Sequence, residues 1–528
     1  MKQQTSILQQ KSPTQPGHLP ELHELLTTGG DHRIAINPET GHNRYYCLPY
    51  PDPSLATFGS TTASGISWNS HQKLEQLRNN LLHRINFDPP DLIYRQEMNR
   101  IRNSLLELCG FHGKNRPAVI FSASGTDLHF IAASLNRQND RLLPVVIMVA
   151  PSESGSGVPD ALKGHWPVGN RTPNPPLFTE ISANLENKPD ILSVHLRLND
   201  GSLRHSREID HEFEFLAKKW ASQGRRVLIV MTDVSKTGCL APSPACALSL
   251  FQKFPENITI LVDACQFRIS PETLKTYINS GFMVALTGSK FLSGPAFSGA
   301  LLLPSQLDSC YRNLPMPPEL KSSYNQGEWP LDWPENSTLL PISNFGLLFR
   351  WEAALEEWKG FLALPSPSIT KFLLQFKHAL LERLDLDPVF RPLPVPEINR
   401  NHQLSTQNWD SIQTIFPFQL LQAKSGHKLL NQSQTLQIYQ QMQSSYSLQN
   451  PSSDAQKGLS PVSSPIRYQL GQPVSWGTNP DDCPGALRLS LSTRLIVEAI
   501  QNKDDKSGIV IKRALDALNK AAELIHAL

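Results

Sequence analysis

Apolar residues in the middle of the chain gather in short runs that end on polar side chains. Residues 258–262 form one such run, which ends at Asp263, and residues 282–286 form another, which leads to Lys290. Runs of this length and composition are typical of buried β-strands. Between them, residues 271–281 have helix length, with proline at the start and glycine at the end. The pattern predicts a strand–helix–strand unit with parallel strands.

Further apolar runs of strand length alternate with helical patterns on both sides of this unit. Strands are predicted at residues 118–121, 143–150, 193–198, 226–231 and 299–303. Helices are predicted at residues 70–86, 91–109, 128–137, 208–223, 345–361, 369–384 and 508–527. This alternation predicts an α/β fold with a mostly parallel sheet flanked by helices. Ligands bind at the carboxyl ends of such strands, so Asp263 and Lys290 are expected to face one crevice.

The chain is long enough for more than one domain. We expect an N-terminal arm and loop over residues 1–68 and a large domain over residues 69–310. A smaller α+β domain is expected over residues 311–528. Residues 401–465 are rich in Gln, Ser and Asn, which favours an insertion within the smaller domain.

A candidate phosphate site follows the predicted strand at residues 118–121. The chain continues through Ser122-Ala-Ser-Gly125-Thr126-Asp127 into a helical pattern. Backbone N–H groups at a helix N-terminus, together with hydroxyl groups, suit a phosphate dianion. Ser, Thr and Asp are also ordinary helix caps, so the loop alone does not decide between the two interpretations.

Charge and cysteine content narrow the classes of function. The chain has 49 Lys and Arg against 47 Asp and Glu, and this balance argues against nucleic-acid binding. Seven cysteines without a C-x-x-C pair argue against a zinc site and a disulfide framework. The first residues lack an apolar leader and no apolar run is long enough to span a bilayer, so we expect a cytoplasmic protein without a membrane partner.

Two motifs resemble the cofactor motifs of a known family. Asp263-Ala-Cys-Gln266 and Thr287-Gly-Ser289-Lys290 look like those of the class V aminotransferase and cysteine desulfurase group, which are fold type I pyridoxal-phosphate-dependent enzymes. Pyridoxal phosphate needs a lysine for a Schiff base and a carboxylate that keeps its ring nitrogen protonated. The resemblance implies pyridoxal 5'-phosphate as cofactor, a fold type I transferase architecture and a homodimer.

The resemblance also implies roles for individual residues. Lys290 is expected to form the Schiff base and then to act as general acid and base, and Asp263 to support the ring nitrogen. Gln266 is expected to contact the phenolic oxygen of the cofactor. The residues expected to bind the cofactor around its phosphate are Gly125, Thr126, Asp127, Thr287 and Ser289. A second Thr is common in the family where Asp127 stands.

The C-terminal part carries a further resemblance and a departure from the family. Arg488 lies in a strand-like segment similar to the one whose arginine holds the substrate carboxylate, and a guanidinium fork suits that group. The alternative is a surface arginine on an alternating strand. Leu470-Gly-Gln-Pro473 resembles the family's Cys-Ala-Gln-Pro, so Leu470 replaces the sulfur-carrying cysteine. We therefore expect that the protein is not a cysteine desulfurase.

Two other positions depart from the family. Ser154 stands where desulfurase-like members have a histidine that stacks on the cofactor ring, and a serine cannot stack in that way. Lys236 or Ser235 stands near the family's asparagine that contacts the phenolic oxygen. Lys236 can either bond an oxyanion or remain solvated. Which residue covers the ring, and what Lys236 does, are left open.

These observations lead to one main hypothesis and two alternatives. The main one is a pyridoxal-phosphate-dependent enzyme acting on an amino acid, aminotransferase-like, through a Schiff base at Lys290, with no metal. The alternatives are a pyridoxal-phosphate-dependent lyase of specialised metabolism and a protein that binds the cofactor without turnover. The substrate side chain is not predicted, because the pocket residues lie in loops.

Overall fold

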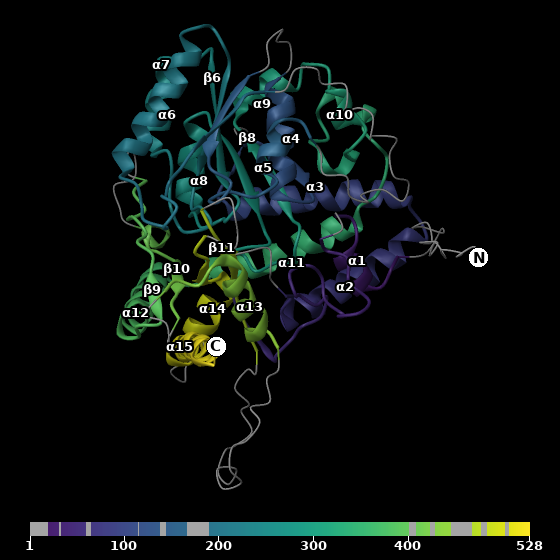
Figure 1. Ribbon diagram of the computed structural model, residues 1–528. Helices are drawn as coiled ribbons and strands as arrows, with labels where there is room; N and C mark the ends of the chain where they lie inside the picture. Colours follow the sequence, from purple (N-terminus) through teal and green to yellow (C-terminus); the bar gives the residue numbers. More distant parts are fainter. Residues whose placement is uncertain are drawn as a thin grey trace, which may run out of the picture.

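The computed structural model describes residues 19–30, 33–59, 65–113, 116–137, 144–165, 189–400, 408–422, 428–444, 467–476, 483–501 and 506–527. Within them a seven-stranded sheet has the order β2-β8-β7-β6-β5-β3-β4 (Figure 1). Strands β4, β3, β5, β6 and β7 pair in parallel, whereas β8 is antiparallel to both β7 and β2. The expected mixed α/β fold with a mostly parallel sheet is confirmed.

The strands of this sheet and the helices of the same part of the chain have the following bounds. The strands are β2 Ala118–Ser122, β3 Val145–Val149, β4 Ile191–Val194, β5 Val227–Thr232, β6 Ile258–Ala264, β7 Met283–Thr287 and β8 Gly299–Leu303. The helices are α1 Leu22–Thr27, α2 Trp68–Ile85, α3 Pro90–Leu108, α4 Gly125–Asn136, α5 Val158–Leu162, α6 Ser206–Ala221, α7 Pro244–Lys253, α8 Pro271–Asn279, α9 Ser305–Tyr311, α10 Pro318–Lys321 and α11 Phe345–Leu362, with 3₁₀ turns η1 Gln326–Glu328 and η2 Pro334–Thr338.

The large sheet is covered by apolar layers on both faces. In β3, Val145, Ile147 and Val149 belong to the cluster that also contains residues of α2, α3, α6, α7, α8 and α11. Val146 and Met148 belong to the opposite cluster, which contains residues of α4 and α5. Side chains alternate between faces along a strand, so burial on both faces makes the strand sequence continuously apolar. This is the physical reason why the apolar runs predict these strands.

A smaller sheet of five strands, with the order β1-β11-β12-β10-β9, lies below the large one in Figure 1. Its elements are β1 Leu55–Phe58, β9 Phe390–Pro392, β10 Ile415–Leu420, β11 Arg467–Val474, β12 Ala486–Ser490, α12 Ser366–Leu386, α13 Gln432–Met442, α14 Thr493–Gln501, α15 Lys506–His526 and the 3₁₀ turn η3 Trp409–Ser411. Strand β1, from the expected N-terminal arm, pairs in parallel with β11, which the sequence analysis did not predict. Of the expected insertion at 401–465, residues 408–422 and 428–444 are described and contain β10 and α13, and the other residues lie outside the described parts of the chain.

Local differences from the expected elements have simple causes. Helix α4 begins at Gly125, three residues before the expected start, because the polar loop forms its first turn. Strand β4 ends at Val194, and Arg197 pairs with Leu203 as an isolated bridge instead of continuing the strand. The predicted strand–helix–strand unit is present as β6, α8 and β7, and β6 and β7 pair in parallel.

Candidate active site

The expected site residues gather at one edge of the large sheet. Strands β5, β6 and β7 run parallel, so their carboxyl ends meet at the same edge. Asp263 is the penultimate residue of β6, and Lys290 lies in the turn after β7. The loop into α4 follows β2, which runs in the same direction because both β2 and β7 are antiparallel to β8. The topology therefore brings the expected phosphate loop, acid and lysine to one place.

The Asp263 carboxylate is buried and fixed by two groups. One oxygen, Oδ1, accepts the Cys265 backbone N–H at 3.2 Å, and the other, Oδ2, lies 3.4 Å from His129 Nε2. Burial works against ionisation, but His129 and the Lys290 charge outweigh it and lower the pKa of Asp263. Burial works against protonation of His129, but Asp263 outweighs it and raises the pKa of His129. The edge of the sheet thus presents an ionised carboxylate.

His129 is a site residue that the sequence analysis missed. It lies one turn into α4, and its Nδ1 is 2.8 Å from the Gly125 carbonyl oxygen, which fixes the ring. Its neighbours along the helix, Leu128 and Phe130, belong to the apolar core. A polar side chain within that apolar run, one turn after the phosphate loop, was the available signal.

The turn that carries Lys290 is held rigidly against α11. Gly288 N–H donates to the Ser298 carbonyl at 2.8 Å, and Gly294 N–H donates to the Gly288 carbonyl at 2.9 Å. A Cβ atom added at Gly288 would lie 2.5 Å from the Ala354 Cβ atom, so only glycine allows this approach. Lys290 itself is half-buried. The close packing of the turn on the helix therefore fixes where the lysine begins.

The N-terminus of α4 has the form expected of an anion site. Ser124 caps the helix, and the buried Asp127 carboxylate accepts the Ser124 backbone N–H at 2.9 Å in a capping box. Asp127 therefore directs its charge into the cap, while Gly125 and Thr126 are partly exposed. A Cβ atom added at Gly125 would lie 2.9 Å from the Cys265 sulfur, so the loop approaches the end of β6 closely. The first backbone N–H groups of the helix face this edge.

Three other expected residues lie beside this loop. The Thr287 hydroxyl donates to the Cys265 carbonyl at 2.6 Å and so joins the ends of β6 and β7. The Ser289 side chain is buried in the turn before Lys290. The Gln266 side-chain oxygen lies 3.5 Å from Arg268 Nε, the longest of the hydrogen bonds that Arg268 makes. All three are placed at the expected edge of the sheet.

Arg488 extends from β12 of the smaller sheet toward the same region. Its guanidinium donates to the Gln472 carbonyl at 2.6 and 3.2 Å and to the Lys236 carbonyl at 3.3 Å. Its side chain is 2% exposed, and burial lowers the pKa of Arg488 to about 10. No ion pair joins it to a carboxylate within the described parts of the chain. It is a buried cation, not the exposed strand arginine of the alternative.

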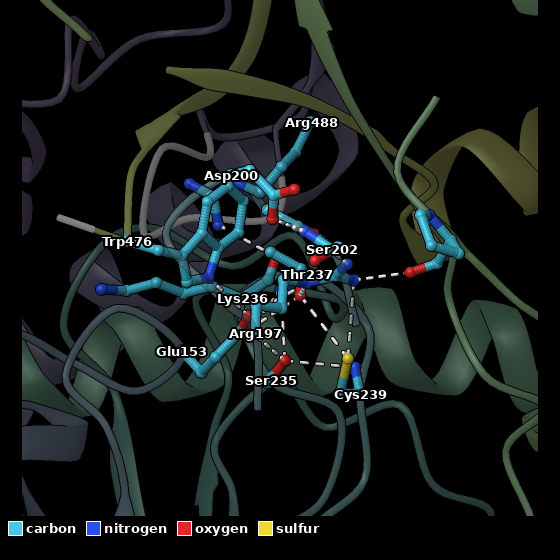
Figure 2. A network of polar contacts seen from close by, with 12 residues as sticks. Glu153, Arg197, Asp200, Ser202, Ser235, Lys236, Thr237, Cys239, Trp476 and Arg488 are labelled. Carbon is cyan, nitrogen blue, oxygen red and sulfur yellow. Dashed lines mark hydrogen bonds and ion pairs between the residues drawn. The ribbon is translucent and has the colours of Figure 1, made fainter. Parts of the chain in front are cut away.

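Figure 2 shows a polar network beneath the loop that contains Lys236. The buried Glu153 carboxylate lies 3.3 Å from Arg197 Nε and accepts hydrogen bonds from both large-sheet and small-sheet residues. The donors are Ser235 Oγ at 2.6 Å, Thr237 Oγ1 at 2.7 Å, Thr237 N at 3.3 Å and Trp476 Nε1 at 3.1 Å. Trp476 follows β11, so this acid links the end of β3 to the smaller sheet.

Two residues next to this network bear on the positions left open above. Ser154 is buried and its hydroxyl has no hydrogen-bond partner among the residues described. The Lys236 amine donates to the Pro151 carbonyl at 3.0 Å. Burial, followed by the Arg488 and Lys290 charges, lowers the pKa of Lys236 to about 8. Lys236 is therefore a second amine at the same edge as Lys290.

The described residues contain no group of three or more His, Cys, Asp or Glu side chains arranged to hold a metal ion. Among the same residues, no helix is both long and apolar enough to cross a bilayer.

Comparison with known proteins identifies the fold but no sequence family. No family model matches the chain, and no curated protein matches it by sequence. A solved NifS-like protein from Rickettsia africae ESF-5 aligns with 88% of this chain and 99% of its own, at 11% identity and a TM-score of 0.50. The cysteine desulfurase CsdA from Escherichia coli aligns with 89% of this chain and 94% of its own, at 12% identity and a TM-score of 0.51. The chain therefore shares the fold of these solved proteins, which agrees with the fold type I architecture expected from the sequence.

Proposed function

We propose that the protein is a pyridoxal-phosphate-dependent enzyme that acts on an amino acid. The observation that carries the proposal is the fixed, ionised Asp263 at the same sheet edge as Lys290. A carboxylate that stays charged in a buried site can hold a proton on a pyridine ring nitrogen. Asp263, Lys290 and the N-terminus of α4 thus match the three ends of this cofactor: ring nitrogen, carbonyl and phosphate.

Each residue has a defined task in this proposal. When bound, the cofactor supplies an electron-withdrawing ring that stabilises negative charge at the substrate Cα. Asp263 holds the ring-nitrogen proton, and His129 keeps Asp263 ionised. Lys290 holds the cofactor and then moves a proton at the substrate Cα. The N–H groups at Gly125 and Thr126, together with the Thr287 and Ser289 hydroxyls, bind the phosphate. Asp127 supports that loop through the cap.

The substrate carboxylate is assigned to Arg488. This guanidinium is buried and bonded to backbone carbonyls, so an incoming carboxylate would be its first full counter-charge. A planar fork orients such a group bidentately and thereby fixes the Cα of the substrate. Gln266 is assigned to the phenolic oxygen of the cofactor. The homodimer that the resemblance implies and the expected cytoplasmic location stay predictions.

The first test is the site of cofactor attachment. Protein loaded with pyridoxal phosphate should absorb visible light and, after borohydride reduction, carry the label on Lys290. Lys236 is the matched control, because it is the other half-buried amine at this edge and its pKa is lowered to about 8. Lys290→Ala should lose the label and Lys236→Met should keep it. A label on Lys236, or an unlabelled protein, contradicts the proposal.

The type of reaction is the finer part of the proposal. We propose transamination, in which the amino acid is converted to a keto acid. A lyase would release a product by elimination, and a protein without turnover would change its absorbance with an amino acid but form no product. Product analysis with a panel of amino acids separates these three outcomes.

A further inference from the structure

We propose that the substrate side chain carries a second acidic group and that Arg268 binds this group. The inference rests on the proposed function and adds the chemical class of the substrate, a dicarboxylic or similarly anionic amino acid. It comes from the buried Arg268 and Arg488 charges, which have no ion-pair partner among the described residues.

Arg268 is buried close to the end of β6 but does not use all its donors. Its Nη1 donates to Thr414 Oγ1 and to the Leu491 carbonyl, both at 2.8 Å. Its Nη2 is buried and has no hydrogen-bond partner in the described structure. The residue is 3% exposed, and the guanidinium lies over the Phe291 ring, 4.9 Å from the centroid. Phe291 directly follows Lys290, so this cation lies against the turn that carries the lysine.

Two other buried arginines show what a purely structural guanidinium looks like in this chain. In Arg102 and Arg350 all three nitrogens donate to oxygens, which are backbone carbonyls in every case but one. Both lie on helices that pack against loops, α3 and α11. Arg268 differs because its Nη2 is left without an acceptor. A buried donor without an acceptor costs free energy, and an anionic ligand would remove this cost.

Arg268 and Arg488 both lie at strand β12. Arg488 belongs to it, and Arg268 donates to the carbonyl of Leu491, the residue that follows it. Arg488 and Ser490 are two positions apart and so point to the same face of the sheet. The Ser490 hydroxyl is buried and has no hydrogen-bond partner among the described residues. This face therefore presents a guanidinium and an unused hydroxyl.

Glu153, the carboxylate whose charge acts on Arg488, is already paired. Glu153 pairs with Arg197, and Asp263 faces His129. Burial and then the neighbouring Arg488 charge lower the pKa of Arg268 to about 9, and no ion pair joins Arg268 to a carboxylate among the described residues. Two buried like charges are costly unless anions accompany them. One carboxylate at Arg488 balances one of them, and a second acidic group at Arg268 balances the other.

The test compares acids with their neutral amides on the wild-type protein. In the cofactor-loaded protein, aspartate and glutamate should change the cofactor absorbance at concentrations about 10- to 100-fold lower than asparagine and glutamine, as expected for one charge-assisted contact. In cofactor-free protein, calorimetry should show that succinate or glutarate binds more tightly than butyrate. Equal affinity for acids and amides would overturn the inference even if cofactor binding is normal.

Variants assign the preference to Arg268. Arg268→Gln should reduce the preference for acids to within a few-fold, while Arg102→Gln is the matched control for loss of a buried guanidinium and should keep it. If Arg268→Gln folds and still prefers acids, the inference is wrong. If it does not fold, the wild-type comparison of acids with amides decides. Failure of the proposed function is a different result, because the protein would then take up no cofactor label. The calorimetry uses cofactor-free protein, so it tests the preference for acids independently of the labelling.

Discussion

Replacing Glu153 by glutamine, a side chain of almost the same size, should strongly destabilise the protein. The carboxylate has donors on both sides: Trp476 and Arg197 at Oε1, and Ser235 and Thr237 at Oε2 (Figure 2). A glutamine has one acceptor oxygen and one NH₂ group. In one orientation the NH₂ group faces the Trp476 and Arg197 N–H groups, and in the other it faces the Thr237 backbone N–H. At least one hydrogen bond is therefore lost in either case, and Arg197 loses its ion-pair partner.

The size of the effect follows from this geometry. Both Glu153 and Arg197 side chains are 0% exposed, so water cannot replace the lost partner. Removing one member of a buried ion pair costs about 3–5 kcal/mol. A typical domain has about 5–15 kcal/mol of total stability, so the change would be a large part of it. The network joins the two sheets, and its loss should therefore weaken their contact.

The assay is denaturant unfolding followed by tryptophan fluorescence, which also reports on Trp476. The matched control is Glu214→Gln, because Glu214 pairs at 2.8 Å with Lys218 and both side chains are partly exposed, at 32% and 44%. An exposed pair of this kind contributes about 0–1 kcal/mol, so the control should unfold close to wild type. If Glu153→Gln also unfolds within about 1 kcal/mol of wild type, the buried acid does not hold the sheets together and the reasoning is refuted.

Two further predictions concern the site itself. The pKa of His129 is raised above the ordinary histidine value of 6.5, so its stabilising effect should be fully present below that pH and lost as the pH rises through the folded pKa. The stability difference between cofactor-free wild type and His129→Gln should therefore shrink as the pH rises, and a constant difference would count against the His129–Asp263 pair. With cysteine and a reductant, the protein should release no sustained sulfide, because a buried Leu470 stands where the family has its cysteine. Burial and then Asp263 raise the pKa of Cys265, which disfavours its thiolate. Turnover that disappears in Cys483→Ser would contradict this prediction.

The sequence predicts the central part of the fold because a strand buried on both faces consists of a run of apolar residues. Strands β6 and β7 are covered on both faces, so they read as unbroken apolar runs, and their ends are marked by Asp263 and the turn before Lys290. The positions of β1 and β11 were not predictable in the same way. Their pairing joins residues more than 400 positions apart, and neither segment has a sequence pattern that indicates which strand it pairs with.

The same distinction explains which site residues were missed. The helix cap at Ser124 and Asp127 is a local motif, and the sequence shows both members. Glu153 and Trp476 are 323 positions apart, and their hydrogen bond exists only because the two sheets meet. Arg268 resembles an ordinary loop arginine until its acceptors, and the nitrogen without one, are known. Charge balance inside a cleft is therefore a property of the tertiary structure.

In the proposed function, that charge balance fixes the orientation of a ligand at this edge of the sheet. An acid whose charge is neutralised by an ion pair, such as Glu153 with Arg197, has no charge left to bind a ligand group. Asp263 is different, because His129 leaves it ionised while its position at the strand end leaves it available to a protonated ring. Arg488 is the opposite case, a cation bonded to carbonyls alone. In the proposed function, Asp263 would hold the ring nitrogen of the cofactor and Arg488 the carboxylate of the amino acid, so these two residues together would fix the orientation of the substrate.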